Sequence, residues 1–431
     1  MDIPIFTSDA SDLSNLLTGL PFLDQVDPAG QRVFLRADFN LPMDDNGSLV
    51  DDGRLRAVLP TINYLLDRGA RIIVGSHLRN PLESATSGRP DPRLSLAPLA
   101  RRLSRLWEVE VGFAPSAVGP ETVRAAAELA PGRVLLLENL RFQPGETAND
   151  PDFARQLAEL ADIYVNDAFG VCHRDHASMT SLPGLAASSV AGFALKSELR
   201  ALDRALANPA RPLGAIIGGQ HIEAKLPVLT KLMGLADFVF LGGTMGDAVA
   251  RLAFGQEVSQ LGLSPESVAE FTNLLRNLKE LRAKLFFPID MVALPGGSQS
   301  VAACAVAAQN LGPELISEDI GPATRLWYWG TLAQCHTIIW NGPMGAYETP
   351  AFARGTAMVT RAMAECQGVT LAGGADTSAA ILKMSDRSQV SFLSAGGSAF
   401  LKALAGEPLV ALEALSRAGA GRKKNDRSTA G

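Results

Sequence analysis

Short apolar strands alternate with amphipathic helical segments along nearly the whole chain of 431 residues. The first clear strand covers residues 32–36, and an apolar stripe at helical spacing follows it between Leu55 and Leu66. Further strands are predicted at residues 71–74, 109–113, 133–137, 163–165, 213–217 and 238–241. This alternation is typical of parallel sheets that carry helices on both faces. We therefore predict the α/β fold class, with two Rossmann-like lobes in which each parallel sheet is flanked by helices.

The predicted division of the chain places an N-terminal lobe at residues 1–190, a C-terminal lobe at 191–400, and a C-terminal segment with a basic tail at 401–431. A helical stretch from Gly192 to Leu206, followed by Pro209 and Pro212, is expected to join the lobes as a hinge helix. The residues from about Ala418 onward have no apolar stripe and predict a loose tail.

Polar and cationic side chains follow the predicted strands of the first half, where ligands bind in open α/β sheets. They are Asp38, Asn40, His77, Glu138, Asn139, Arg141, Asn166, Asp167, His173 and Arg174. Arginine suits bidentate contacts to phosphate and carboxylate, so Arg54, Arg141 and Arg174 with His77 indicate an anion site, with ordinary solvated side chains as the alternative. A metal site at His173 and His176 is disfavoured, because no fitting cysteine or acidic cluster accompanies them.

The strands of the second half lead into five glycine-rich turns, at residues 218–221, 242–246, 341–345, 373–377 and 394–398. Such turns are expected to leave backbone N–H groups bare at helix starts, which favours phosphate; the alternative is that glycine ends each strand for steric reasons. Neither a P-loop nor a GxGxxG sequence is present. Asp376 and Thr377 follow Gly373 and Gly374, either as a plain helix cap or as ligands of magnesium and phosphate.

Composition excludes several classes of protein. With 47% hydrophobic and 19% charged residues, the chain is not a disordered protein, and 45 acidic against 39 basic residues argue against a nucleic-acid partner. The four cysteines show no CxxC spacing, and the first residues carry acids where a secretory signal carries bases. Two uncharged stretches, 177–195 and 291–313, are broken by polar residues, glycine or proline and predict buried structure, not membrane spans. We expect a cytoplasmic protein.

Ordered sequence motifs carry a strong resemblance to a known family. They are RADFNLP at 36–42, DDGRLR at 51–56, SHL at 76–78, ENLRF at 138–142, YVNDAFG at 164–170, HRDHAS at 173–178, WNGPMG at 340–345 and Asp376-Thr377. On these residues the chain resembles the phosphoglycerate kinase family, from about residue 22 to about residue 415. The resemblance implies a lobe for 3-phosphoglycerate, a lobe for the magnesium nucleotide, and closure that brings them together.

The implied reaction is reversible transfer of the terminal phosphoryl of ATP to the carboxylate of 3-phosphoglycerate, which gives 1,3-bisphosphoglycerate and ADP. This is a phosphotransferase step of glycolysis, gluconeogenesis and carbon fixation. The resemblance also implies Mg²⁺ bound with ATP or ADP and a monomeric protein without nucleic-acid or membrane partners.

Roles carried over from the family fall on residues of both halves. Asp38, Asn40 and Arg54 would hold the glycerate end, with Arg54 also neutralising the moving phosphoryl, and His77, Arg141 and Arg174 would grip the 3-phosphate. For the nucleotide, the resemblance implies that Lys225 binds the phosphates, Glu348 binds the ribose and Asp376 binds the magnesium. The surface on which the nucleotide lies would be formed by Gly219, Gly243, Asn341, Gly373, Gly374 and Thr377.

Several positions depart from the family pattern. Asn80 stands where the family has a substrate-binding arginine, with Arg79 displaced by one, and His221 stands where it has a catalytic lysine. Ala375 and Ser398 replace glycines of two turns. With a reference pKa of about 6.5 a histidine is mostly neutral at pH 7, although a nearby polyphosphate favours its charged form. The catalytic set is then Arg54, Lys225 and His221, and His221→Lys is expected to raise turnover.

Two other functions remain open from the sequence. The departures at Asn80 and His221 are compatible with a catalytically impaired relative that binds nucleotide or phospho-acid as a sensor or scaffold. A kinase for another carboxylate is supported by Asn80 alone, because the other acid-substrate positions are kept.

Overall fold

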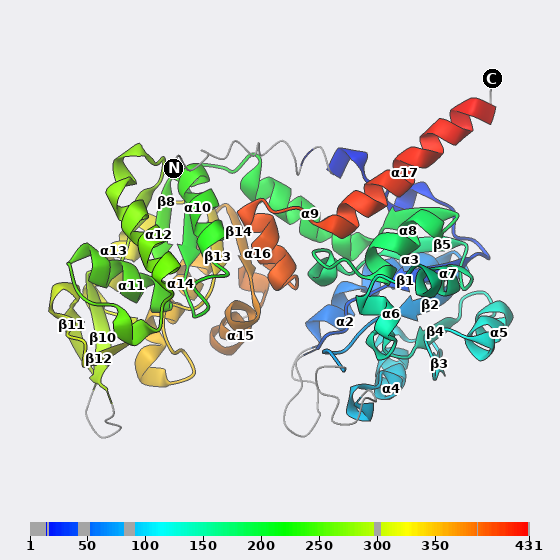
Figure 1. Cartoon of the computed structure of the whole chain (residues 1–431), viewed down its shortest axis with the longest axis horizontal. Coiled ribbons are helices and arrows are strands. Elements are labelled where there is room, and N and C mark those ends of the chain that lie inside the picture. The colour runs from blue at the N-terminus through cyan, green and yellow to red at the C-terminus, as the bar shows by residue number, and fades with distance from the viewer. Residues whose placement is uncertain are drawn as a thin grey trace. The chain divides into compact units, whose positions relative to one another are not determined.

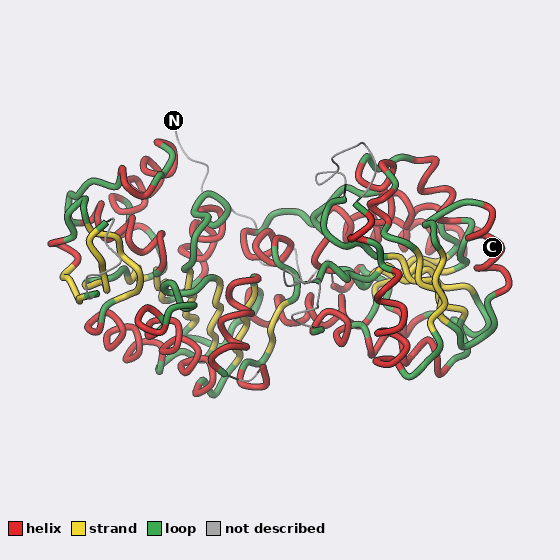
Figure 2. The backbone as a smooth tube through the Cα atoms, turned by 90° about the horizontal axis from the view of Figure 1, so that it is seen from below, coloured by secondary structure: helices red, strands yellow, loops and turns green. Residues whose placement is uncertain are grey.

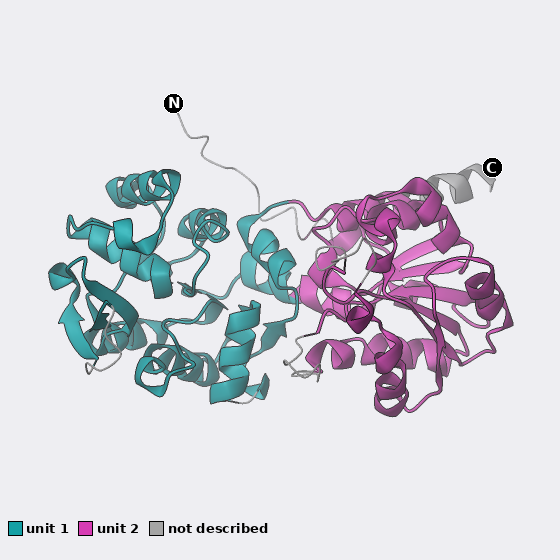
Figure 3. Cartoon of the chain, turned by 60° about the horizontal axis from the view of Figure 1, so that its bottom comes forward, with its two compact units in different colours: residues 1–10, 201–407 teal, residues 11–200, 408–431 magenta. Residues whose placement is uncertain are grey.

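The computed structural model describes residues 14, 17–41, 52–81, 91–296, 303–385 and 387–429, with the backbone alone for 420–429. These residues form two compact units (Figure 3). Unit 1 contains described residues from 201–407, and unit 2 contains those up to residue 200 together with those from 408 onward. The chain passes from unit 2 to unit 1 within helix α9 (Phe193–Leu206), which begins and ends within one residue of the predicted linking helix.

Unit 2 is built on a six-stranded sheet in the order β3-β4-β2-β1-β5-β6, and every pairing in it is parallel (Figure 1). Its strands are β1 (Arg32–Arg36), β2 (Arg71–Gly75), β3 (Val111–Ala114), β4 (Val134–Leu137), β5 (Ile163–Asn166) and β6 (Ser188–Ala191). Its helices besides α9 are α2 (Gly53–Ala57), α3 (Leu59–Asp67), α4 (Ala97–Trp107), α5 (Pro120–Glu128), α6 (Pro144–Thr147), α7 (Pro151–Ala158), α8 (Leu182–Leu185) and α17 (Val410–Thr429). Short turns of helix are η1 (Leu23–Gln25), η2 (Pro92–Leu94), η3 (Leu140–Phe142), η4 (Phe169–Val171) and η5 (Ala177–Ser181).

The apolar stripe between Leu55 and Leu66 forms two helices rather than one. Helix α2 ends at Ala57 and α3 begins at Leu59 with Pro60 in its first turn. Proline has no N–H to continue the hydrogen bonds of α2, so the chain restarts with bonds from Thr61 and Ile62 to the Val58 carbonyl. The stripe still faces the core, since Leu55, Ile62 and Leu65 are fully buried.

The C-terminal residues form helix α17, which continues to Thr429, so the expectation of a loose tail from about Ala418 was wrong. Alanine, arginine and lysine are strong helix formers, and they extend a helix that has already begun. The N-terminal part of α17 packs against β6, α8 and η5, and the Ala411 N–H donates to the Cys172 carbonyl (3.1 Å).

Unit 1 holds a second six-stranded parallel sheet, in the order β15-β14-β13-β7-β8-β9. Its strands are β7 (Leu213–Ile217), β8 (Phe238–Leu241), β9 (Lys284–Phe286), β13 (Thr337–Asn341), β14 (Val369–Gly373) and β15 (Phe392–Ser394). Its helices are α10 (Leu226–Leu235), α11 (Gly243–Ala253), α12 (Pro265–Arg276), α13 (Pro322–Leu332), α14 (Arg354–Glu365), α15 (Ala375–Met384) and α16 (Ser398–Ala405), with short turns η6 (Ser259–Leu261), η7 (Leu278–Glu280), η8 (Ala308–Asn310), η9 (Pro350–Phe352) and η10 (Arg387–Gln389). In both units, helices lie on both sides of the strands (Figure 2).

A small antiparallel sheet, which the sequence did not predict, also belongs to unit 1. It has the order β11-β10-β12, from β10 (Asp290–Pro295), β11 (Cys304–Ala307) and β12 (Leu315–Ile320). The expectation that the uncharged stretch 291–313 is buried holds only for Met291, Ala293, Ala308 and Leu311 among its described residues, and it was wrong for β11, where Cys304, Ala305 and Ala307 are exposed. Residues 297–302 of that stretch lie outside the described residues. No described helix is long and apolar enough to cross a membrane.

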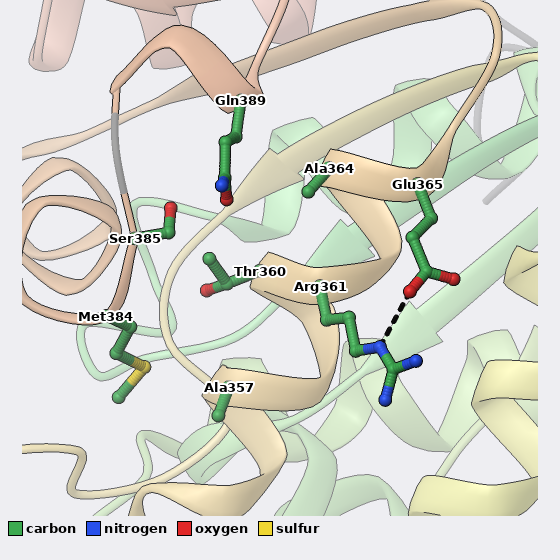
Figure 4. A pocket seen from close by; sticks show the side chains of 8 residues that line it. All are labelled: Ala357, Thr360, Arg361, Ala364, Glu365, Met384, Ser385 and Gln389. Carbon is green, nitrogen blue, oxygen red and sulfur yellow. Dashed lines mark hydrogen bonds and ion pairs between the residues drawn. The ribbon is translucent and has the colours of Figure 1, made fainter.

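Strand order determines where a ligand can bind in each unit. In unit 2 the order reverses at β1, which pairs with β2 on one side and β5 on the other; in unit 1 it reverses at β7 and β13. Ligands of open α/β sheets bind at the carboxyl ends of strands at such reversal points. A separate cavity of about 260 Å³ in unit 1, lined by α14 and by residues at and after the end of α15, contains none of the predicted site residues (Figure 4).

Candidate active site

The predicted polar residues of unit 2 follow the three strands that meet at its reversal point. Asp38 and Asn40 follow β1, His77 follows β2, and Arg174 follows β5. The carboxyl ends of these parallel strands share one edge, which explains why residues distant in sequence form one site.

Asp38 is the centre of the contacts at this edge. Its carboxylate is buried, forms an ion pair with Arg54 from α2, and accepts a hydrogen bond from the Asn40 N–H (3.0 Å). His77 Nε2 lies 4.0 Å from Asp38 Oδ1. Gly170 is required here by close approach, because a Cβ on it would meet the Asp38 carboxylate and lie 3.5 Å from Arg54 Nη1. The structure thus brings together the residues predicted for the glycerate end.

A fully buried charged network lies behind these residues, and the sequence analysis missed it. Arg36, the last residue of β1, is 0% exposed; its Nε donates to Ser178 Oγ (2.7 Å), and its Nη2 lies 3.8 Å from Glu146 Oε1. Glu146 accepts from the Ser178 hydroxyl (2.7 Å) and from its N–H (3.0 Å). The available signal was a charged residue at the end of an otherwise apolar strand, since Lys, Arg, Asp and Glu are rarely buried unless paired.

His77 acts in this network as a neutral hydrogen-bonding group. Its Nδ1 faces Arg36 Nη2 at 3.4 Å, and because a guanidinium can only donate, Nδ1 must accept and the ring proton belongs on Nε2. Burial, together with the cations Arg36, Arg141 and Arg54, holds the pKa of His77 well below its usual range. His77 therefore offers an N–H donor on its Nε2 side rather than a positive charge.

Arg141 and Arg174 supply positive charge at the same edge. Burial, reinforced by the neighbouring cations Arg36 and Arg174, lowers the pKa of Arg141 to about 10. Arg174 is exposed after η4, and Arg141 lies in η3 with its Nη1 donating to the Arg79 carbonyl (2.8 Å). Cations that disfavour one another in the free protein are suited to bind a multiply charged anion.

In unit 1 the glycine turns after β7, β8 and β13 are packed against one another. The N–H groups of Gly218, Gly219, Gly242 and Gly243 donate to carbonyls of Asn341, Pro343, Ile217 and Met344, and the Gly342 N–H donates to Thr377 Oγ1 (2.7 Å). The expectation that these turns present bare N–H groups was therefore wrong for these glycines. Their reason is close backbone approach, since a Cβ on Gly342 would lie 2.0 Å from the Gly218 carbonyl oxygen.

Lys225 lies directly beneath these packed turns. Its Nζ donates to the Gly218 carbonyl oxygen, and the residue is 7% exposed at the start of α10. Burial lowers the pKa of Lys225 to about 8, and the carboxylate of Asp376 opposes that shift. A buried ammonium without a described carboxylate in contact is poised for an anionic ligand.

The turn after β14 carries the remaining polar residues. Asn341 Nδ2 donates to the Gly373 carbonyl (2.7 Å), and both Asn341 and Thr377 are buried, so they hold the turns together. Gly374 has φ +105° and approaches Asn341 Nδ2, so it cannot carry a side chain. Glu348 lies further along the loop after β13, exposed, with its carbonyl accepting from Lys383 Nζ (3.0 Å) rather than contacting the glycine turns.

Asp376 is exposed in the first turn of α15, where no hydrogen bond or ion pair ties its carboxylate to the described residues. Among the described residues no three His, Cys, Asp or Glu side chains gather to hold a metal ion by themselves. A single exposed carboxylate beside a glycine turn would fit magnesium bound with a nucleotide, because magnesium keeps waters and is held by one or two carboxylates plus substrate phosphates. The residues present therefore fit a magnesium nucleotide.

His221 follows the Gly218-Gly219 turn and is exposed, with a left-handed backbone (φ +60°). This places the ring at the surface of the turn, four residues before the buried Lys225. Among the described residues, Lys225 is therefore the one buried ammonium at this turn, and His221 does not supply a second buried cation.

A further residue that the sequence analysis missed supports the loop after β13. Asp319, at the end of β12, accepts from the Gly355 N–H (2.8 Å) and the Ile320 N–H (2.9 Å), and burial raises its pKa to about 7. A Cβ on Gly345 would lie 2.6 Å from Asp319 Oδ1, so this carboxylate fixes the path of the loop 341–345.

Two α/β units, one with a cationic site at its sheet reversal point and one with packed glycine turns around a buried lysine, define a phosphotransferase with two anionic substrates. The family model described as phosphoglycerate kinase matches residues 23–407. The chain belongs to the phosphoglycerate kinase family, which confirms the predicted family, fold class and enzyme class.

Relatives and solved structures agree with this assignment. A phosphoglycerate kinase from Desulforudis audaxviator is 44% identical over 386 residues (89% of this chain, 96% of the relative), and one from Desulfosudis oleivorans is 41% identical over 395 residues (92% and 98%). The structure of phosphoglycerate kinase from Coxiella burnetii matches with a TM-score of 0.80 and 32% identity, covering 92% of this chain and 99% of that chain.

Proposed function

We propose that this chain is a working phosphoglycerate kinase in which unit 2 binds 3-phosphoglycerate and unit 1 binds magnesium ATP. The observation that carries the proposal is the convergence of Asp38, Arg54, His77 and Arg141 at the reversal point of the unit 2 sheet. The proposed domains, 1–190 for the acid and 191–400 for the nucleotide, with a C-terminal segment at 401–431, assign one substrate to each sheet.

The acid substrate is held by residues of different kinds in unit 2. Arg141 and Arg174 provide charge for the 3-phosphate, and His77 provides a neutral N–H donor that Arg36 keeps on Nε2. Asp38 and Asn40 hold the glycerate hydroxyl end, and Arg54, which pairs with Asp38 in the free protein, can turn its remaining donors toward the carboxylate.

The nucleotide is held in unit 1. Lys225 binds its phosphates, the packed turns around Gly219, Gly243, Asn341, Gly373, Gly374 and Thr377 form its binding surface, and Glu348 binds the ribose hydroxyls. Asp376 would hold the magnesium ion, which supplies charge neutralisation for the nucleotide phosphates when bound.

The transfer itself needs no proton acceptor. A carboxylate oxygen of 3-phosphoglycerate forms a bond to the terminal phosphorus while the bond from that phosphorus to the bridging oxygen of ATP breaks, and ADP leaves with the electron pair. The residues contribute by positioning and by neutralising charge on the moving phosphoryl, the role proposed for Arg54, Lys225 and His221.

The test is direct detection of the acyl phosphate. Purified protein is incubated with magnesium ATP and 3-phosphoglycerate, and hydroxylamine traps the product as the hydroxamate. The control is the double variant Arg54→Ala/Asp376→Asn. Hydroxamate well above that control supports the kinase, whereas none, with nucleotide still bound, supports a binding relative that acts as a sensor or scaffold.

We also propose that the protein acts as a cytoplasmic monomer without a nucleic-acid or membrane partner. All four cysteines are unpaired, as in proteins of reducing compartments, and the net charge of −6 disfavours binding to nucleic acid or anionic lipid. Sedimentation equilibrium at several concentrations tests the monomer, and a mass near 91 kDa, about twice the 45.5 kDa of one chain, would contradict it.

A further inference from the structure

Arg79 adopts a left-handed backbone conformation beside the acid site, with φ +50°. Few residues other than glycine adopt this conformation, because the side chain crowds the following carbonyl. Four such residues occur in the described chain: Arg79, Glu108, Asn149 and His221. Glu108 ends helix α4, where a left-handed residue is common. Arg79 ends no described helix, so its conformation needs another explanation.

Two residues of the proposed acid site hold the main chain of Arg79. Its N–H donates to Asn40 Oδ1 (2.9 Å), and its carbonyl accepts from Arg141 Nη1 (2.8 Å). Both contacts involve backbone atoms, and glycine would make them without strain. The main-chain role therefore does not explain an arginine at this position.

The side chain of Arg79 is exposed and makes no hydrogen bond or ion pair with the residues that the structure describes. The guanidinium of Arg141 contacts the carbonyl of Arg79 itself, so the Arg79 side chain starts close to that group. The same region also contains Arg36, Arg54 and Arg174. The arginines of this region outnumber its carboxylates, Asp38 and Glu146, so the region is suited to an anion. A strained backbone conformation is typical of a functional site, where the strain is kept because the side chain contributes when the ligand binds.

We propose that Arg79 is a substrate-binding residue whose guanidinium joins Arg141 on the phosphate of 3-phosphoglycerate. This inference rests on the proposed function. Arg141 Nη1 contacts the Arg79 carbonyl, so the Arg79 side chain starts close to that guanidinium, and Asn80, the next residue, need not then supply the charge.

Three substitutions separate the charge of Arg79 from its backbone. Arg79→Gly removes both charge and strain, Arg79→Gln removes the charge alone, and Arg79→Lys keeps it. Glu108→Gly is the matched control, because it relieves a left-handed residue at an exposed position outside the site. For each variant we would measure KM for both substrates and kcat by the hydroxamate assay, Kd for 3-phosphoglycerate by calorimetry, and Tm.

We expect Arg79→Gly and Arg79→Gln to raise KM and Kd for 3-phosphoglycerate by about tenfold or more, with KM for magnesium ATP changed less than about twofold. Arg79→Lys should recover part of the loss. Arg79→Gly and Glu108→Gly should both raise Tm by about 2 °C, and only Arg79→Gly should weaken the binding of 3-phosphoglycerate.

Unchanged affinity for 3-phosphoglycerate in Arg79→Gly and Arg79→Gln would overturn the role of Arg79 while leaving the kinase intact. Absence of hydroxamate from the unaltered protein would instead overturn the proposed function. Binding of 3-phosphoglycerate by that inactive protein, weakened in Arg79→Gly, would still support Arg79 as an acid-binding residue; equal binding would overturn it.

Discussion

Replacing Glu146 with glutamine should destabilise unit 2 strongly, because it removes the negative charge that faces Arg36. Both side chains are 0% exposed, and Arg36 cannot release its proton to relieve the loss. At an effective dielectric constant of about 20, unit charges 3.8 Å apart attract by about 4 kcal/mol. Removing one partner of a buried ion pair costs about 3–5 kcal/mol, and glutamine keeps the volume and one acceptor for Ser178, so we expect about 3 kcal/mol.

Amide hydrogen exchange read by mass spectrometry measures this loss within the full chain. Peptides from β1 and β5 report on unit 2, and peptides from β7 and β13 in unit 1 are the internal control. The matched variant is Glu365→Gln, whose partner Arg361 is largely exposed, and we expect a change below about 0.5 kcal/mol there. If Glu146→Gln lowers the opening free energy of the β1 and β5 peptides by less than about 1 kcal/mol, the reasoning is refuted. Such a result would mean that the buried ion pair between Arg36 and Glu146 does not stabilise unit 2.

Three further predictions concern charge in both units. Burial lowers the pKa of Lys225 from 10.5 to about 8, so above pH 8 the protein must take up a proton when it binds nucleotide, and its affinity for nucleotide should fall by up to about tenfold per pH unit. Lys225→Met should bind nucleotide weakly at every pH. A nucleotide affinity of the unaltered protein that does not change with pH would contradict this prediction. His221→Lys should raise kcat by about tenfold or more, since it places a fixed ammonium at that turn, and an unchanged or lower rate counts against the proposed role of that turn. Burial raises the pKa of Asp167 to about 7, so between pH 7 and about 4 this carboxyl is protonated in the folded protein and ionised in the unfolded chain. As the pH falls through that range, the unfolding free energy of the unaltered protein should therefore rise by about 1.4 kcal/mol per pH unit relative to that of Asp167→Asn. Equal pH slopes for the two proteins would refute this prediction.

The sheets could be predicted from the sequence because their strands are apolar runs separated by clear helical stripes. β1, β7 and β8 begin and end at the predicted residues. The antiparallel sheet was missed because β12 carries Glu318 and Asp319 and so lacks an apolar run, and because β11, although apolar in sequence, has only four residues and is largely exposed. The continuation of helix α17 beyond about Ala418 was missed because helix propensity extends a helix even where the sequence has no apolar stripe.

The candidate site was predictable where polar residues follow strands, and less so where burial decides. Asp38, His77 and Arg141 were found because the ends of parallel strands converge. Arg36 and Glu146 lie 110 residues apart in the sequence, and only the folded chain shows that they form a buried polar network with Ser178. The glycine turns were located correctly, but the N–H groups of Gly218, Gly219, Gly242 and Gly243 donate to backbone carbonyls, which spacing along the chain cannot reveal.

The division of the two substrates between the two units can be measured most directly by crossed binding titrations. Calorimetry would give Kd for 3-phosphoglycerate and for magnesium ADP in the unaltered protein, in Arg174→Gln and in Asp376→Asn. We predict that Arg174→Gln raises Kd for 3-phosphoglycerate by about tenfold and leaves Kd for magnesium ADP unchanged. Asp376→Asn should raise Kd for magnesium ADP and leave Kd for 3-phosphoglycerate unchanged. Loss of nucleotide affinity in Arg174→Gln, or of acid affinity in Asp376→Asn, with Tm unchanged, would contradict the assignment of one substrate to each sheet.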